Sequence, residues 1–267
     1  MSADIAMDIL EAITTRRSVR TFDGTSLTPD ERKQLMDCVA SAENPFGGSF
    51  TIRLKEFDLK NGFKPATYGV IRGASDFFTI GMADDDTSAL AVGFCFEQVV
   101  LKASQLGLGT CWIAGTFKGS DFERGESWPE GESLRIVCPV GTPAGKSFME
   151  KFARMALGSK NRKPFGDLFF EGNCSTPLLP DSRFGEALAM LRLAPSSTNS
   201  QLWRAVVEGD TVHFYYISKG QVSIVDCGIG LSHFYLTEKY RGRGGEFFKA
   251  SQLPEVKKNW TYLISYK

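Results

Sequence analysis

The sequence predicts an α+β protein made of two related halves that meet around central buried helices. The main observation is an internal repeat, in which residues 89–109 align without a gap with residues 224–244 at a constant offset of 135 (228 − 93). Both segments read as helices that are apolar on nearly every side, which is typical of helices buried all round. Three pairs of glycines coincide in the alignment: Gly93 with Gly228, Gly107 with Gly242 and Gly109 with Gly244.

The second observation is a shared order of elements in the two halves. In each half a helix is followed by a polar loop and then by a strand, as in "MDCVASAENPFGGSFTIRLKEF" and "MLRLAPSSTNSQLWRAVVEG". We therefore expect each half to form a small mixed or antiparallel sheet with flanking helices. The halves are expected to join through largely buried helices over 88–106 and 224–240.

The other elements of the first half follow from local patterns. Apolar residues on one face predict a helix over Ile5–Thr15. Thr28, followed by Pro29 and by Glu31 three residues on, marks the start of a second helix that runs through Ala42. "FTIRLKEF" alternates like a strand, whereas "ASDFFTIGM" and "SLRIVCPVG" are nearly continuous apolar runs and read as buried strands.

The boundary between the halves is expected in "FFEGNCSTPLLPDS", residues 169–182. This stretch is rich in Gly, Pro and Ser, as linkers are. We therefore expect a first half over 1–168, a linker over 169–182 and a shorter, degenerate second half over 183–267.

Composition excludes several classes of protein. The 267 residues include 31 basic and 31 acidic side chains, so the formal net charge is zero and no broad basic face for nucleic acid is expected. No apolar run reaches the roughly 20 residues of a membrane span, so no membrane partner is expected. The six cysteines form no CxxC pair, and the N-terminus is acidic where a signal peptide is basic. We expect free thiols and a cytoplasmic protein.

Familiar catalytic motifs do not match the chain. "GTPAGKS" (141–147) has three residues between its glycines where a Walker loop has four, and Pro143 removes a backbone donor. His213 and His233 have no carboxylate or cysteine at metal-ligand spacing, so no metal site is expected. Neither the GxSxG elbow of serine hydrolases nor a GxGxxG motif is present. This shortage of acid–base groups favours a cofactor that carries the chemistry itself.

Polar clusters mark the candidate binding site. "TTRRSVR" places three arginines within five residues at a helix end, where they could contact phosphate or form a solvated patch. "PSSTNSQ" (195–201) holds too many hydrogen-bonding groups for a plain turn. A smaller basic group, "KNRK" (160–163), could close on a phosphate or lie on the surface.

Together these segments resemble the FMN-dependent nitroreductase family. The resemblance rests on "RRSVRTF", "PSSTNSQLW", "GLGTCWIAGTF" and "KNRKPF", and it extends over most of the chain. In that family a homodimer holds each FMN at its interface, with the Arg-Arg-Ser segment from one subunit and the Pro-Ser-Ser loop from the other. Here the two segments lie in different halves of one chain, and the matching first-half loop "SAENPFGG" is degenerate. The resemblance therefore implies a nitroreductase-like fold in a monomeric, fused pseudodimer that kept one flavin site.

The resemblance also implies roles for the matching residues. The Arg-Arg-Ser segment and "KNR" would contact the phosphate, the N1–C2=O edge and the ribityl chain of FMN. "WIAG" would lie along one flavin face, and the Pro-Ser-Ser loop would hold the ring from the other half. The implied cofactor-binding residues are Arg16, Arg17, Ser18, Arg20, Trp112, Ile113, Ala114, Gly115, Lys160, Arg162, Pro195, Ser196, Ser197, Asn199 and Gln201.

The implied activity is an oxidoreductase in which flavin N5 carries the chemistry and no side chain is expected to be catalytic. Hydride would pass from NAD(P)H to FMN and then, in the same pocket, to a small electron-poor acceptor such as a nitroaromatic or quinone. Two alternatives stay open: a flavin-binding storage or sensing protein with little reductase activity, and a structural pseudodimer without flavin. Two departures from the family pattern bear on turnover: Leu202 stands where a proline is common, and the family's usual polar residue on the substrate side, expected near 66–68, is not clearly present.

Overall fold

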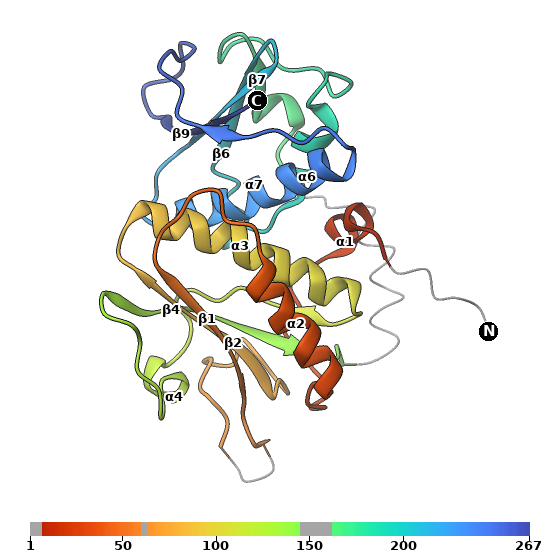
Figure 1. Ribbon diagram of the computed structural model, residues 1–267, viewed down its shortest axis with the longest axis vertical. Coiled ribbons are helices and arrows are strands. Elements are labelled where there is room, and N and C mark those ends of the chain that lie inside the picture. The colour runs from red at the N-terminus through yellow and green to blue at the C-terminus, as the bar shows by residue number, and fades with distance from the viewer. Residues whose placement is uncertain (1–6, 60–62, 145–161) are drawn as a thin grey trace, which may run out of the picture.

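Two sheets lie on opposite sides of a central pair of helices in the computed structural model of the protein (Figure 1). The structure describes residues 7–59, 63–144 and 162–267. The central helices are α3 (Asp86–Gln105) and α7 (Val222–Tyr240), which pack side by side. This layered arrangement of helices and sheets is the α+β class that the sequence predicts.

The first sheet is antiparallel, with the strand order β1–β2–β4–β3. Its central strand β2 is buried over nearly its whole length, as its apolar sequence predicts. Helices α2 and α3 both contact this sheet. The elements are α2 (Pro29–Ser41), β1 (Phe50–Glu56), β2 (Asp76–Ala83), β3 (Gly109–Thr110) and β4 (Glu132–Gly141).

The second sheet has the order β5–β6–β7–β9–β8, and only β5 runs parallel to its neighbour. Helix α6 packs against α7 beside this sheet. The elements are β5 (Phe169–Glu171), α6 (Gly185–Leu193), β6 (Trp203–Glu208), β7 (Thr211–Tyr216), β8 (Phe247–Phe248) and β9 (Thr261–Tyr266).

The two sheets share one topology apart from β5. The order β1–β2–β4–β3 corresponds strand for strand to β6–β7–β9–β8. Along the chain, α3 lies between β2 and β3, just as α7 lies between β7 and β8. The aligned glycines meet where the central helices cross. A Cβ atom on Gly93 would lie 2.1 Å from the Val225 oxygen, and one on Gly228 would lie 2.3 Å from the Leu90 oxygen. Such a reciprocal contact is what a two-fold axis produces.

Several helix and strand ends agree with the sequence analysis. Helix α2 begins after Thr28, whose hydroxyl and the Glu31 carboxylate form the expected capping box. Helix α1 covers Ile9–Thr15 with Asp8 as its N-cap, and the first residues of the predicted helix lie outside the described part of the chain. A short helix α4 (Gly119–Phe122) was not foreseen.

The segment expected to be a linker begins with a short strand of the second sheet. Residues Phe169–Glu171 form β5, which pairs with β6, and Phe169 is fully buried. Leu178 also lies in the main core. The Gly, Pro and Ser residues that suggested a linker form the turns around β5, and the apolar run Leu168–Phe170 is too short to stand out as a strand in the sequence.

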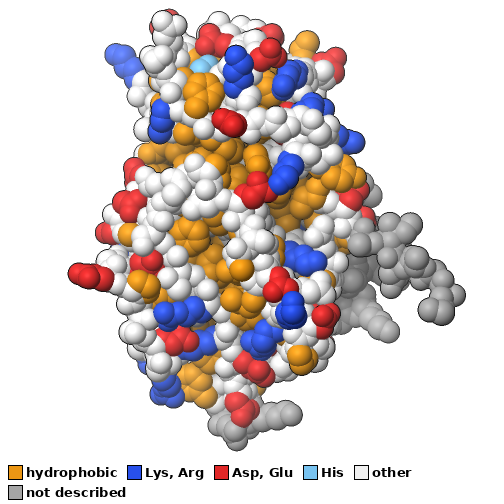
Figure 2. Space-filling view, viewed as in Figure 1, with side chains coloured by type: hydrophobic (Ala, Val, Ile, Leu, Met, Phe, Trp, Pro, Cys, Tyr) orange, Lys and Arg blue, Asp and Glu red, His pale blue; other side chains and the backbone are white. Residues whose placement is uncertain are grey.

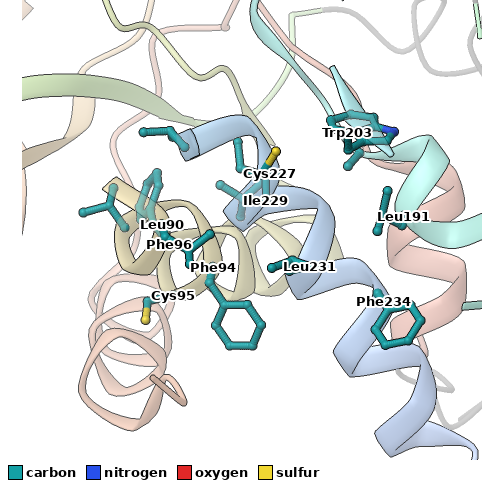
Figure 3. Packing of buried hydrophobic residues seen from close by; sticks show 14 of the residues in the cluster. Leu90, Phe94, Cys95, Phe96, Leu191, Trp203, Cys227, Ile229, Leu231 and Phe234 are labelled. Carbon is teal, nitrogen blue, oxygen red and sulfur yellow. The ribbon is translucent and has the colours of Figure 1, made fainter. Parts of the chain in front are cut away.

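The main hydrophobic core runs continuously through both halves. Around α3, Leu90 and Phe94 pack in the same cluster as Ile229 and Leu231 of α7 (Figure 3). Both central helices are buried along most of their length, which confirms the expectation from their apolar sequences. On the outside, Figure 2 shows hydrophobic side chains gathered across the middle of one face. Among the described residues, no helix is long and apolar enough to cross a membrane.

Candidate functional site

A cavity of about 520 Å³ lies between the two halves, beside the N-terminal end of α7. This volume is within the range of small-molecule and cofactor sites, about 300–1,000 Å³. The lining comes from the first half and from the second half together. Its residues are Ser18, Arg20, Val70, Met82, Cys111, Trp112, Ile113, Ala114, Gly115, Thr116, Arg135, Ile136, Pro195, Ser196, Ser197, Thr198, Gln221, Val222, Val225, Asp226 and Ile229.

The Arg-Arg-Ser segment reaches this cavity because it runs as an extended chain along β3. Ser18 pairs with Thr110, and the Val19 N–H donates to the Thr110 oxygen at 2.8 Å. Val19 is buried against Gly109, where a side chain on the glycine would collide with it. Side chains alternate along an extended chain, so Ser18 and Arg20 face the cavity while Val19 faces the core.

Arg16 lies behind the cavity wall, in a buried position. Its side chain is 5 % exposed, and its Nε lies 3.7 Å from Oε1 of the fully buried Glu97. The Nε and Nη1 atoms of Arg16 have no hydrogen-bond partner in the described part of the chain. Burial lowers the pKa of the neighbouring Arg17 to about 10, so that guanidinium still carries its charge at neutral pH.

The segment 112–115 forms one wall of the cavity. The Trp112 Nε1–H donates to Oε2 of Glu97 at 2.8 Å, which turns the polar edge of the indole away from the cavity. Ile113 pairs with Val137 of β4 through two backbone hydrogen bonds, which fixes this wall on the sheet. At Gly115 a Cβ atom would meet no other atom within 4 Å, so a ligand can approach the backbone there.

The polar loop 195–201 has an unusual backbone. Thr198, Asn199 and Gln201 have φ values of +52°, +54° and +49°. Left-handed conformations are uncommon for residues other than glycine and cost of order 1–3 kcal/mol where the conformation is sparsely populated. Three of them within four residues must be held by other interactions, and such strain clusters at functional sites.

Hydrogen bonds within and around the loop hold this conformation. The Gln201 N–H donates to Ser196 Oγ at 3.0 Å, and the Gln201 amide donates to the Asn199 backbone oxygen at 3.1 Å. Gln201 Oε1 accepts from the Lys163 N–H at 2.9 Å. Gln201 is only 1 % exposed, so its amide is a scaffold for the loop and does not line the cavity.

Arg162 binds the end of α6 and the loop. Its guanidinium donates to the backbone oxygens of Leu193 at 2.6 Å and Ala194 at 2.7 Å, and to Asn199 Oδ1 at 3.3 Å. Burial, followed by repulsion from Arg16 and Arg192, lowers the pKa of Arg162 to about 10. Arg16 and Arg162 therefore lie close enough to repel each other, in a region that favours an anion.

Asp226 is a cavity residue that the sequence analysis missed. It is 5 % exposed, and both carboxylate oxygens accept from the Ser197 N–H, at 3.1 and 3.0 Å. Burial raises the pKa of this carboxyl to about 7, against the lowering effect of the Ser197 hydrogen bond. A lone acid in the apolar run "IVDCGIGL" was the signal that could have marked it.

The structure brings most of the predicted site residues together, in two layers. Those that line the cavity are Ser18, Arg20, Trp112, Ile113, Ala114, Gly115, Pro195, Ser196 and Ser197. Arg16, Arg162, Asn199 and Gln201 surround it without lining it, and Arg17 is also absent from the lining. Lys160 lies outside the described residues. The cavity residues that sequence reasoning missed include Arg135 and Asp226.

No metal centre is evident in the part of the chain that the structure describes, because its His, Cys, Asp and Glu residues form no group of three or more suited to an ion. The six cysteines are all free. Burial raises the pKa of Cys111 in the cavity wall, so its thiol stays protonated at neutral pH.

Comparison with known proteins identifies a family and similar folds. The family described as "Putative TM nitroreductase" matches residues 8–238. A nitroreductase structure from Thermotoga maritima aligns with 100 % of this chain and 97 % of its own, at 20 % identity and a TM-score of 0.61, which shows a shared fold. No curated protein matches the chain.

Several other solved structures match about half of the chain. A nitroreductase family protein from Clostridium novyi covers 55 % of this chain and 92 % of its own, at 20 % identity and a TM-score of 0.43. A nitroreductase with bound FMN from Bacteroides fragilis covers 51 % of this chain and 89 % of its own, at 18 % identity and a TM-score of 0.42.

Proposed function

Because the chain belongs to the nitroreductase family that matches residues 8–238, we propose that it is an FMN-dependent oxidoreductase that passes hydride from NAD(P)H to an electron-poor acceptor. The observation that carries this proposal is the cavity between the halves. Ser18 and Arg20 of the first half line it together with Ser196 and Ser197 of the second half. These are the two segments on which the resemblance to flavin-binding nitroreductases rests.

The residues around the cavity fit FMN. Arg16 has two buried nitrogen atoms without a partner among the described residues, and the anionic end or the pyrimidine edge of FMN would supply acceptors. The open backbone at Gly115 leaves room for a flat ring to lie against it. Ser18, Ser196 and Ser197 offer hydroxyl groups for the ribityl chain.

The chain's own residues would bind and orient the reactants. FMN, when bound, supplies the atom that accepts and donates hydride. The Arg20 guanidinium, at the cavity edge, stabilises negative charge that gathers nearby. Val70, Met82 and Ile136 give the cavity apolar walls that exclude water and suit a flat aromatic acceptor such as a nitroaromatic or quinone. Without a GxGxxG motif for a second nucleotide site, donor and acceptor would use this cavity in turn.

We also propose that the chain is a pseudodimer with one flavin site. The first-half loop "SAENPFGG" (41–48), which corresponds to the Pro-Ser-Ser loop of the second half, carries Phe46. The Phe46 ring lies 5.0 Å from Phe247 and 5.1 Å from Phe94, centre to centre. Aromatic side chains therefore fill the space that a second flavin would need, which supports one FMN per chain in a monomer.

Purification with FMN tests this function. We expect a yellow protein that retains about one FMN per chain and oxidises NADH or NADPH when a quinone or nitroaromatic is added. A protein that binds no flavin would refute the proposal, and two FMN per chain would refute the single site. Retention of FMN without NAD(P)H oxidation would instead support the storage or sensing alternative.

A further inference from the structure

A buried cluster of four polar side chains lies behind the cavity, between the two central helices. We name Arg16, Glu97, Trp112 and His233 the buried cluster. Glu97 and His233 are fully buried, on α3 and α7 respectively. Glu97 is its centre, because Oε2 accepts from the Trp112 indole at 2.8 Å while Oε1 lies 2.9 Å from His233 Nε2 and 3.7 Å from Arg16 Nε.

The hydrogen bonds of His233 fix where its protons are. His233 Nδ1 lies 3.1 Å from the Met190 backbone oxygen, and a carbonyl oxygen can only accept, so Nδ1 carries a proton. The 2.9 Å contact between Nε2 and Glu97 Oε1 needs a second proton, because both atoms are otherwise acceptors. Glu97 and His233 together therefore hold one proton beyond the neutral imidazole and the carboxylate. Whichever atom holds it, the pair has no net charge.

This shared proton matters for Arg16. An ionised Glu97 beside a neutral imidazole would cancel the Arg16 charge, whereas the net-neutral pair leaves the guanidinium as an uncompensated cation. The Arg16 side chain is 5 % exposed, and two of its nitrogen atoms lack an acceptor in the described residues. A buried charge without a counter-ion is costly, so this arrangement calls for an anion beyond those that the described residues supply.

We propose that Glu97 and His233 are positioning residues of the flavin site, which share one buried proton and so keep Arg16 available as a cation for the anionic part of FMN. Glu97 also holds Trp112 in the cavity wall. This inference rests on the proposed function, because FMN is the anion that it invokes.

Three variants separate the shared proton from simple packing. In His233→Gln the introduced amide can donate to Glu97 without an extra proton, and Glu97 still accepts from Trp112 and lies beside Arg16. Glu97 then cancels the Arg16 charge, and FMN affinity should fall at least tenfold. In Glu97→Gln the amide accepts from Trp112 and donates to a neutral His233, so FMN affinity should change less than threefold.

The double variant Glu97→Gln/His233→Gln gives the decisive result. It has no carboxylate to cancel the Arg16 charge, so we expect it to bind FMN at least fivefold more tightly than His233→Gln. If the two residues only pack, the double variant should bind FMN no more tightly than either single variant, and that outcome would overturn the inference. His213→Gln is the matched control, since His213 lies in β7 and contacts Ser265, and its FMN affinity should equal that of the wild type.

A measurement on the wild-type protein locates the proton without FMN. The chain has two histidines, so ¹⁵N NMR of the imidazoles shows two sets of signals, and His213→Gln assigns them. We expect a protonated Nδ1 on His233, and a ring that is protonated on Nε2 alone would overturn the inference. If the wild type retains no FMN, the proposed function itself is refuted. If the wild type binds FMN but the FMN affinities of the variants rank differently, only this inference is refuted.

Discussion

Asp226→Asn should remove a large pH dependence of stability. Asp226 is 5 % exposed, and burial raises its pKa from 3.8 to about 7 in the folded protein. The folded state therefore binds a proton that the unfolded state has already lost in this range. The stability that this proton contributes is fully present below about pH 4 and is lost as pH rises through about 7.

The size of the effect follows from the shift of that pKa. Each pH unit between the two pKa values costs about 1.4 kcal/mol of stability, so the two units from pH 5 to pH 7 cost roughly 3 kcal/mol. The asparagine side chain is close in shape to the protonated carboxyl and cannot ionise. We therefore expect the stability of Asp226→Asn relative to the wild type to increase by roughly 3 kcal/mol between pH 5 and pH 8.5, with most of the change below about pH 7.

Urea unfolding of the cofactor-free protein at several pH values between 5 and 8.5 measures this difference. Because the two proteins share every other titrating group, the difference in their free energies of unfolding isolates Asp226. Asp210→Asn removes a carboxylate that is 73 % exposed and should shift stability by less than about 0.5 kcal/mol at each pH. A constant difference between wild type and Asp226→Asn across the range would refute the reasoning.

Four further predictions concern packing and the cavity. Gly93→Ala should destabilise the protein by about 3 kcal/mol in urea unfolding, because the new Cβ would lie 2.1 Å from the Val225 oxygen. Gly115→Ala should leave stability within about 0.5 kcal/mol of wild type, yet lower FMN affinity in a fluorescence titration, since its Cβ would enter the open space beside the cavity wall. Arg20→Ala should weaken FMN binding about ten- to a hundredfold in the same titration. Phe46→Ala should cost about 2 kcal/mol of stability in urea unfolding, because it removes a ring that lies 5.1 Å from Phe94 and 5.0 Å from Phe247, centre to centre.

The kinetic order of the reaction tests the shared cavity. If donor and acceptor occupy it in turn, double-reciprocal plots at several acceptor concentrations should be parallel, as in a ping-pong scheme. Steady-state rates of NAD(P)H oxidation with a quinone measure this. Intersecting lines would mean that both reactants are bound together, which one shared position does not allow.

Local patterns in the sequence predicted most of the helices and strands. Alternation and apolar runs located β1, β2 and β4, and the capping residues Thr28 and Glu31 located the start of α2, because these elements depend on neighbours within a few residues. The repeat aligned Gly93 with Gly228, and the structure places these two glycines against each other. The strand β5 escaped notice because it is three residues long and is stabilised by pairing with distant β6.

The sequence by itself determined which residues could form the cavity, since the Arg-Arg-Ser segment and the Pro-Ser-Ser loop are recognisable from local residue types alone. Only the tertiary structure decided which of these residues line the cavity and which hold the loop or lie behind the cavity wall. Gln201 and Asn199 hold the loop, while Arg16 lies behind the wall beside Glu97. Glu97 and His233 are 136 positions apart and come within 2.9 Å only because α3 packs on α7. Burial, which sets the cost of a charge, depends on that packing and has no signature in a local stretch of sequence.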